Sequence, residues 1–407
     1  MSSPRYGVSP WIDRFPSSRI PSLPRQRGAA AADVVIVGGG LTGCATAYAF
    51  AASGIDSVLL ERDRIGRGAT AAASGLVADD PGLNVADLEK AIGARAARHA
   101  RQSWRRASLD FQALLRRLSV KCDLEPRPLV TIAQNEEQAA RLAREQKARR
   151  DAGFDAAMLK TQAVAAEVGL PARSALRSRD SATIDPYRAA LGLAAAATAR
   201  GAKLFERTVV KRITFTRKHA LVTTDSGTIQ TRRVVVATGV PTALFKSLVR
   251  HFWFHTTALV LTERVPAAIR RQLGRRAAVL RDTVAPPHIV RWLDDERLMI
   301  NGADGDPTPE RQRDKILVQR TGQLMYELST LYPDISGIRA EYGWETAYAR
   351  TVDGLPYIGA HRNYPHHLFA FGDSSRSVTG AFLASRIFLR SHLGEADPAD
   401  DVFGFHR

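Results

Sequence analysis

The chain has 407 residues, of which 45% are hydrophobic and 24% are charged. These proportions are those of an ordinary globular protein, so they exclude a disordered or fibrous chain. The two cysteines, Cys44 and Cys122, cannot form a disulfide scaffold, and no CxxC or Cys/His cluster suggests a metal. We therefore predict a protein without a bound metal that folds in the reducing cytoplasm.

The net charge of +17 permits a nucleic acid, an anionic membrane or an acidic ligand as partner. The basic residues are mostly scattered arginines, and in residues 88–118 they alternate with Trp104 and Phe111 at helical spacing. That pattern is typical of a solvated helix face, so we do not expect a nucleic-acid partner.

Residues 1–28 contain five prolines, which disfavour a helix. We expect an extended, Pro/Arg-rich arm along the surface. The apolar stretch that follows, residues 29–60, resembles a signal or membrane segment, but Asp33 opens it and Gly38, Gly39 and Gly40 interrupt it. We therefore predict no transmembrane segment and a cytoplasmic protein.

A strand, a glycine-rich turn and a helix account better for this stretch. Residues 33–37 form a continuous β-branched run, typical of a strand buried on both faces. The turn supplies GxGxxG at Gly38, Gly40 and Gly43, which allow a tight turn, a close approach of a pyrophosphate, and close packing of helix on strand. Glu61 ends the second strand of the unit, where an acidic residue binds a ribose diol.

Motifs further along the chain carry a resemblance to a known family. The sequence after Glu61 resembles that of the D-amino-acid oxidase-like superfamily of FAD-dependent oxidoreductases, which includes glycine and sarcosine oxidases and γ-glutamylputrescine oxidoreductase. The resemblance covers nearly the whole chain. It is carried by residues 62–75, the DPYR segment at 185–188, the strand at 208–213, the VVVATG segment at 234–239, the DGLPYIG segment at 353–359, and residues 369–379.

The resemblance implies an α/β fold with a discontinuous Rossmann-type FAD-binding domain and an α+β substrate domain that has an antiparallel sheet. We assign residues 29–94, 160–248 and 345–407 to the first domain, and residues 95–159 and 249–344 to the second. FAD is expected to bind without a covalent link, since neither cysteine lies in an attachment motif. The implied FAD-binding residues are Gly38, Gly40, Leu41, Thr42, Gly43, Glu61, Arg62, Arg67, Ala69, Thr70, Ser74, Val210, Ala237, Thr238, Gly239, Gly372, Ser374, Ser375, Arg376, Ser377, Val378 and Thr379.

Sequence patterns also place elements of the second domain. Residues 129–133, 255–262 and 288–293 are predicted strands of the antiparallel sheet. Residues 135–151 mix glutamates with arginines, which predicts an exposed helix.

The resemblance implies oxidation of a carbon–nitrogen bond by hydride transfer to flavin N5, giving an imine and then a carbonyl. Family members that oxidise amino acids carry an arginine for the substrate carboxylate, and the matching position here is Tyr348. Arg350, two residues on, either replaces that arginine or is a structural ion-pair partner. We expect an amine or N-substituted amino acid as substrate. Four aromatic or acidic residues are candidates for the wall of the substrate pocket, with packing in the core as the alternative: Tyr348, Trp344, Glu345 and Trp253.

The second departure lies in the loop beneath the flavin ring, where the family has repeated glycines and this chain has Gly372-Asp373-Ser374-Ser375-Arg376-Ser377-Val378-Thr379. The Cβ of serine penalises positive φ angles. If the loop keeps its shape, Arg376 faces the N1–C2 edge of the flavin and stabilises the reduced anion. If not, FAD binds loosely or is inactive.

Our candidate catalytic residues are therefore Arg376, Tyr348 and Arg350. The leading hypothesis is an FAD-dependent amine or amino-acid oxidase, or a dehydrogenase that passes electrons to a quinone-type acceptor instead of oxygen. Two alternatives are a tRNA-modifying oxidase and a flavin-binding protein without turnover.

Overall fold

Two large sheets organise the chain, for which the computed structural model describes residues 4–407. The first sheet is 8-stranded, and its parallel part runs in the order β10, β3, β2, β13, β20. Strands β19, β12 and β11 join it in antiparallel pairs. The bounds are β2 (Gly28–Val37), β3 (Ser57–Leu60), β10 (Lys203–Phe205), β11 (Val210–Phe215), β12 (Ala220–Thr224), β13 (Gly227–Gly239), β19 (Tyr357–His361) and β20 (Tyr364–Phe371).

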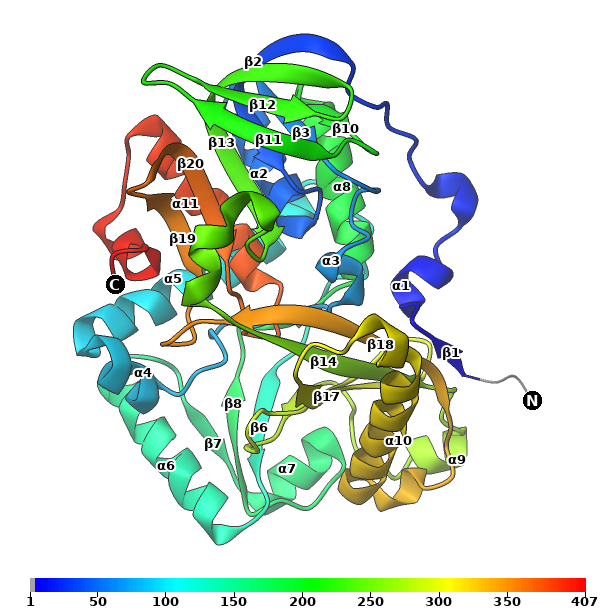
Figure 1. Cartoon of the computed structure of the whole chain (residues 1–407). Helices are drawn as coiled ribbons and strands as arrows, with labels where there is room; N and C mark the ends of the chain where they lie inside the picture. Colours follow the sequence, from blue (N-terminus) through cyan, green and yellow to red (C-terminus); the bar gives the residue numbers. More distant parts are fainter. Residues whose placement is uncertain (1–3) are drawn as a thin grey trace.

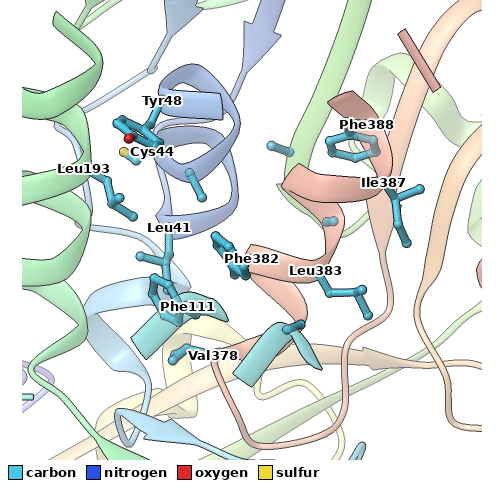
Figure 2. Packing of buried hydrophobic residues seen from close by; sticks show 14 of the residues in the cluster. Leu41, Cys44, Tyr48, Phe111, Leu193, Val378, Phe382, Leu383, Ile387 and Phe388 are labelled. Carbon is cyan, nitrogen blue, oxygen red and sulfur yellow. The ribbon is translucent and has the colours of Figure 1, made fainter. Parts of the chain in front are cut away.

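The predicted strand at 33–37 is the C-terminal half of β2, and its apolar residues are buried on both faces of the sheet. One face is covered by α2 (Leu41–Ala52), α5 (Ala94–Arg117), α8 (Pro186–Thr198) and α11 (Thr379–Leu393). Figure 2 shows how Phe382 of α11 lies close to Phe111 of α5, and their rings stack with centroids 5.1 Å apart. The other face packs against Phe245, Leu248 and Phe252. This is the predicted Rossmann-type α/β layer.

The second sheet is 9-stranded, in the order β1, β18, β14, β17, β16, β15, β6, β8, β7, and most of its pairs are antiparallel. Helices α7 (Thr161–Val168) and α10 (Arg313–Leu331) cover one face. The strands are β1 (Arg5–Tyr6), β6 (Leu129–Ala133), β7 (Ala157–Leu159), β8 (Ser174–Ser178), β14 (Trp253–Thr262), β15 (Val279–Arg281), β16 (Ile289–Trp292), β17 (Leu298–Gly305) and β18 (Ala340–Arg350). In Figure 1, β14 and β18 cross the middle of the molecule, between the two layers.

The three strands predicted from alternation correspond to β6, β14 and β16 of this sheet. The predicted helix at 135–151 is α6 (Glu136–Asp151), which begins after Asn135, whose side chain accepts a hydrogen bond from the Gln138 N–H. A small third sheet joins β4 (Leu76–Val77), β9 (Ala182–Thr183) and β5 (Glu125–Pro126). The remaining helices are α1 (Pro10–Asp13), α3 (Ala69–Ala72), α4 (Val85–Ile92) and α9 (Ala267–Arg270).

Several segments pack in the core of the other sheet from the one expected from our domain assignment. Helix α5, which we assigned to the substrate domain, buries Trp104 and Phe111 in the core of the first sheet. Conversely, α7 and β8, which we assigned to the FAD-binding domain, belong to the second sheet and its core, and residues 345–350 continue β18 there. An apolar stripe shows that an element is buried, but the partner that covers it is fixed by long-range packing.

The N-terminal arm runs down one side of the molecule and links the two layers (Figure 1). We expected an extended arm, but part of it is helical. Pro10 begins the short helix α1, at a position where proline is well tolerated. Trp11 of α1 is buried and donates a 2.9 Å hydrogen bond to the Ala73 carbonyl. None of the helices within residues 4–407 combines the length and apolar character that a membrane crossing requires.

Candidate active site

The turn between β2 and α2 has no room for side chains. Gly38 has a φ of +110°, and a Cβ there would lie 2.6 Å from the carbonyl oxygen of Ala237. A Cβ on Gly43 would lie only 1.8 Å from the carbonyl oxygen of Gly38. The first glycine therefore permits the turn beside β13, and the third permits close packing of α2 on β2. Bare main chain at the N-terminus of a helix fits a diphosphate group.

Polar groups around this turn hold it in place. The Glu61 carboxylate accepts hydrogen bonds from the Gly39 N–H at 2.6 Å and the Asp63 N–H at 2.8 Å, so it lies directly beside the glycine turn. Thr70 Oγ1 accepts a 2.8 Å hydrogen bond from the Leu41 N–H, which ties α3 to the first turn of α2. Arg62 is exposed, and the half-buried Arg67 has a buried Nε without a hydrogen-bond partner.

A cavity of about 200 Å³ lies between the two sheets, next to the N-terminus of α2. Twelve of the predicted site residues line it: Leu41, Thr42, Ala69, Thr70, Ser74, Gly239, Tyr348, Gly372, Ser374, Arg376, Ser377 and Val378. Residues that sequence reasoning missed complete its wall, among them Thr257, Leu259 and Asn301 from the second sheet. Segments that are far apart in the sequence thus converge on one space at the domain boundary, where ligand sites commonly lie.

The loop before α11 is built without the expected glycines. Its positive φ angles fall on Gly372, at +85°, and on Arg376, at +58°, so the serines avoid the conformation that their Cβ atoms disfavour. Serine side chains fasten the loop instead, since Ser377 Oγ accepts a 2.9 Å hydrogen bond from the Ala78 N–H. The Thr379 hydroxyl donates to the Ala78 carbonyl at 2.8 Å. The serine substitutions are therefore compatible with an ordered loop.

Arg376 reaches from this loop to the second sheet. Its guanidinium donates to Thr257 Oγ1 at 3.0 Å and to Asp304 Oδ2 at 2.5 Å. The Tyr348 hydroxyl donates to the same Asp304 oxygen. The predicted catalytic candidates Arg376 and Tyr348 are thus brought together by an acidic residue that sequence reasoning missed.

Charge and burial fix the protonation of this cluster. Burial alone would raise the pKa of the Asp304 carboxyl, but the hydrogen bonds and charge of Arg376, with the Tyr348 hydroxyl, hold that pKa below its ordinary value. Burial, together with the adjacent Asp304, raises the pKa of the Tyr348 hydroxyl. At neutral pH the cluster therefore holds a carboxylate, a guanidinium and a neutral phenol.

Three residues considered as pocket walls lie elsewhere, as does Arg350. Trp344 is buried beneath α3 and donates a 3.0 Å hydrogen bond to the Ala72 carbonyl, and Glu345 pairs with Arg313 at 2.8 Å on the α10 side of the sheet. Trp253, 55% exposed, pairs in register with Arg350 at the end of β18, and Arg350 is exposed. Successive residues of a strand point to opposite faces, so Trp344 and Tyr348 share a face while Glu345 is on the other. On β18 the cavity is lined only by Thr346, Ala347 and Tyr348.

The other implied FAD contacts lie outside this cavity. Val210 begins β11 opposite Thr224, and Ala237 is buried in β13 next to Gly38. Ser375 is buried in the loop, and its N–H donates to Asp373 Oδ1 at 2.9 Å. Their contacts with the cofactor, like that of Thr238, remain predictions.

Both cysteines are buried, and burial raises the pKa of the Cys44 thiol and raises that of Cys122 to about 12. A thiol that stays protonated is a poor nucleophile. Non-covalent binding of FAD stays a prediction. Within residues 4–407, no group of histidine, cysteine or acidic side chains is arranged to hold a metal ion.

A parallel sheet with a glycine turn, covered by a second sheet across a shared cavity, defines the class of dinucleotide-binding oxidoreductases. Residues 33–390 match the family model described as FAD dependent oxidoreductase (DAO), so the chain belongs to this family of FAD-dependent enzymes. The naked glycine turn and the adjacent Glu61 fit the diphosphate and ribose of FAD, the cofactor of the family.

Relatives and solved structures agree with this assignment. γ-Glutamylputrescine oxidoreductase from Escherichia coli K12 is 27% identical over 373 residues, covering 90% of this chain and 85% of that protein. Glycine oxidase from Bacillus licheniformis is 23% identical over 391 residues, covering 92% and 99%. The crystal structure of glycine oxidase from Geobacillus kaustophilus superposes with a TM-score of 0.77 at 22% identity, covering 93% and 99%, and shows the same fold.

Proposed function

We propose that this enzyme oxidises the carbon–nitrogen bond of an amine or an N-substituted amino acid. The two relatives named above are a γ-glutamylputrescine oxidoreductase and a glycine oxidase, and both of these substrates carry an amino group. The observation that carries the proposal is the cluster of Tyr348, Arg376 and Asp304 at the cavity between the sheets.

This cluster favours an amine over a simple α-amino acid. Among the described residues that line the cavity, Arg376 is the single cationic side chain, and it already pairs with Asp304. A substrate carboxylate would have to compete with Asp304 for that guanidinium. Arg350 lies exposed at the end of β18, so it can meet only a carboxylate that extends beyond the cavity.

Bound FAD supplies the hydride acceptor, its N5 atom, and the chain supplies orientation and a dry site. With FAD bound, a neutral amine would give up a hydride from its carbon to the flavin and a proton from its nitrogen to water, and the resulting imine would react with water to give a carbonyl compound and an amine or ammonia. Leu259, Ile358 and Phe371 contribute apolar surface to the cavity, which excludes water from the reacting carbon. The neutral Tyr348 hydroxyl is placed to orient the substrate nitrogen.

Reoxidation of bound FAD would need a two-electron acceptor, either oxygen, which would give hydrogen peroxide, or a quinone, which would give a quinol. We propose an acceptor of one of these two kinds. Oxygen consumption measured with and without an artificial quinone acceptor distinguishes them.

Anaerobic mixing of the yellow holoenzyme with a panel of amines tests the proposal. We expect bleaching of the flavin absorbance by diamines or N-alkyl amino acids, and slower bleaching by glycine. The Tyr348→Phe variant should bleach more slowly while it keeps its FAD. Failure of every amine to bleach a flavin that dithionite does reduce would overturn the proposal.

A further inference from the structure

A second cavity, of about 240 Å³, lies where the N-terminal arm covers the end of β16 and the start of α8. It shares no lining residue with the cavity between the two sheets, which we call the flavin cavity. Its volume is below the roughly 300–1,000 Å³ of sites that hold drug-sized ligands, so it suits a small metabolite. Apolar walls come from Trp11, Phe15 and Leu293.

Arg291 is the unusual residue of this cavity. It is only 5% exposed, and its Nη1 donates to the carbonyl oxygens of Ser74 at 2.8 Å and Ile184 at 3.2 Å. Its Nε is buried without a hydrogen-bond partner, and no described carboxylate hydrogen-bonds to its guanidinium. Burial lowers the pKa of Arg291 to about 10, so the group is still charged at neutral pH. A buried cation normally has an anion in direct contact, whereas Asp185, Asp294 and Glu125 act on Arg291 without a hydrogen bond to it.

The other arginines of the cavity are committed to carboxylates. Arg188 pairs with both Asp123, at 3.0 Å, and Asp185, at 3.3 Å. Arg127 likewise forms ion pairs with Glu125 and with Asp294, the latter at 3.2 Å. Arg14 pairs with Asp295 at 2.6 Å.

Arg188 and Arg127 therefore each pair with two carboxylates. Burial raises the pKa of Asp185 to about 6, and burial together with the neighbouring Glu125 raises the pKa of Asp294. The cavity therefore holds a guanidinium without a directly bonded anion, and carboxylates that share their cations.

We propose that this cavity binds a zwitterionic α-amino acid with an apolar side chain. Its carboxylate pairs with the Arg291 guanidinium, its ammonium group lies at Asp294 and Asp185, and its side chain packs against Trp11, Phe15 and Leu293. A simple anion would leave the carboxylates unbalanced, and a simple cation would leave Arg291 unpaired. The binding claim does not rest on the proposed reaction, because the site is separate from the flavin cavity.

Equilibrium dialysis of radiolabelled L-leucine against the anaerobic holoenzyme tests this proposal. Two competitors each carry half of the ligand's charge: 4-methylpentanoate lacks the ammonium group, and 3-methylbutylamine lacks the carboxylate. We expect saturable binding of leucine, and at least tenfold weaker displacement by either competitor than by unlabelled leucine. Absence of saturable binding, or equal displacement by 4-methylpentanoate, would overturn the proposal.

Variants locate the binding site. Arg291 also holds the Ser74 carbonyl beside the flavin cavity, so its replacement risks disturbing both sites. Asp294→Asn removes a charge at the partly exposed rim, and Leu293→Phe fills the cavity. Each should weaken leucine binding at least tenfold, whereas the exposed Glu137→Gln should not.

Tyr348→Phe reports on the flavin cavity and should leave leucine binding intact. Leucine binding that persists in Asp294→Asn and Leu293→Phe but disappears in Tyr348→Phe would place the ligand at the flavin and overturn the proposal.

Discussion

Asp304 accepts a 2.5 Å hydrogen bond from the guanidinium group of Arg376, across a separation of 72 residues. Asp304 belongs to β17 of the second sheet, and Arg376 to the loop that precedes α11 of the first. Both side chains are at least nine-tenths buried. The pair therefore joins the second sheet to the loop before α11, and it neutralises the single cation that lines the cavity between the sheets within the described residues.

This pairing predicts opposite effects of two substitutions on the flavin. Sulfite adds to oxidised flavins, and the adduct is stabilised by positive charge near the N1–C2 edge. Arg376→Ala removes that charge and leaves the Asp304 carboxylate behind, so sulfite affinity should fall at least tenfold. Asp304→Asn leaves the Arg376 charge unneutralised, so affinity should rise. Absorbance titration with sulfite measures both constants.

Asp306→Asn is the matched control, because Asp306 lies two residues away and its side chain is 96% exposed. It should leave sulfite affinity unchanged. An unaltered affinity in Arg376→Ala would show that this arginine does not face the flavin.

The glycine turn allows a sharp test of the cofactor site. In Gly43→Ala the new methyl group would lie 1.8 Å from the Gly38 carbonyl oxygen, so β2 and α2 must separate. We expect purified protein with little or no FAD and a lower melting temperature, measured by flavin absorbance per chain and by thermal unfolding.

Gly322→Ala serves as the comparison. Gly322 lies inside α10, and a Cβ there would meet no atom within 4 Å. Alanine is favoured over glycine in a helix by about 1 kcal/mol, so this variant should be slightly more stable and keep its FAD. Full FAD content in Gly43→Ala would contradict the proposed role of the turn.

The parts of the fold that the sequence predicted correctly are local ones. The β2–turn–α2 unit is encoded in consecutive residues, because a buried strand, glycines and a small-residue helix follow directly. The helix α6 and the strand β6 were likewise predicted from their own residues, although Glu145 and Arg149 of α6 are buried and not exposed as we expected. The family assignment followed from the order of such local motifs along one chain.

The missed parts depend on contacts between distant segments. Asp304 meets Arg376 only because β17 pairs with β14 and the loop before α11 reaches that sheet. The residues around Asp304 form no pattern that predicts either contact. Trp344 and Tyr348 share a strand face, yet one packs beneath α3 and the other lines the cavity. Distant segments cover the rest of the strand face, and they determine which of its residues line the cavity. The local sequence does not show which segments these are.

A buried charge cluster beside the flavin loop gives a third prediction. Asp80 is fully buried, and both of its oxygens accept 2.9 Å hydrogen bonds from Arg281, with Arg149 at 3.4 Å and Arg101 at 3.9 Å. Burial opposes ionisation, but these arginines outweigh it and lower the pKa of Asp80. Asp80→Asn removes the shared anion and should cost about 3–5 kcal/mol of unfolding free energy, seen as a lower melting temperature.

The adjacent residue is a built-in control. Burial and the charge of Asp80 raise the pKa of Asp79, so its ionised form is disfavoured. Asp79→Asn keeps an oxygen for the Ser181 hydroxyl, which donates to Asp79 Oδ1 at 2.9 Å. We expect a change within about 1 kcal/mol. Equal losses in the two variants would refute the distinct roles given to these carboxyls.

Asp185 gives a prediction with a defined pH dependence. It caps α8 by accepting a 3.0 Å hydrogen bond from the Arg188 N–H, and burial raises its pKa from 3.8 to about 6. The folded protein therefore binds this proton more tightly than the unfolded chain, and between about pH 4 and pH 6 the stability contributed by Asp185 falls as pH rises. Above pH 6 the full cost, about 3 kcal/mol for a shift of roughly two units, is present.

Asparagine caps helices as well as aspartate does and carries no charge. Asp185→Asn should therefore raise the melting temperature at pH 8, by an amount equivalent to about 1–3 kcal/mol, and the gain should vanish near pH 4. Thermal unfolding at pH 4, 6 and 8 measures this trend. Asp397→Asn, at the exposed cap of the 3₁₀ helix Pro398–Phe403, should change the melting temperature little at each pH. A loss of stability in Asp185→Asn at pH 8 would mean that the ion pair with Arg188 outweighs the burial of the charge.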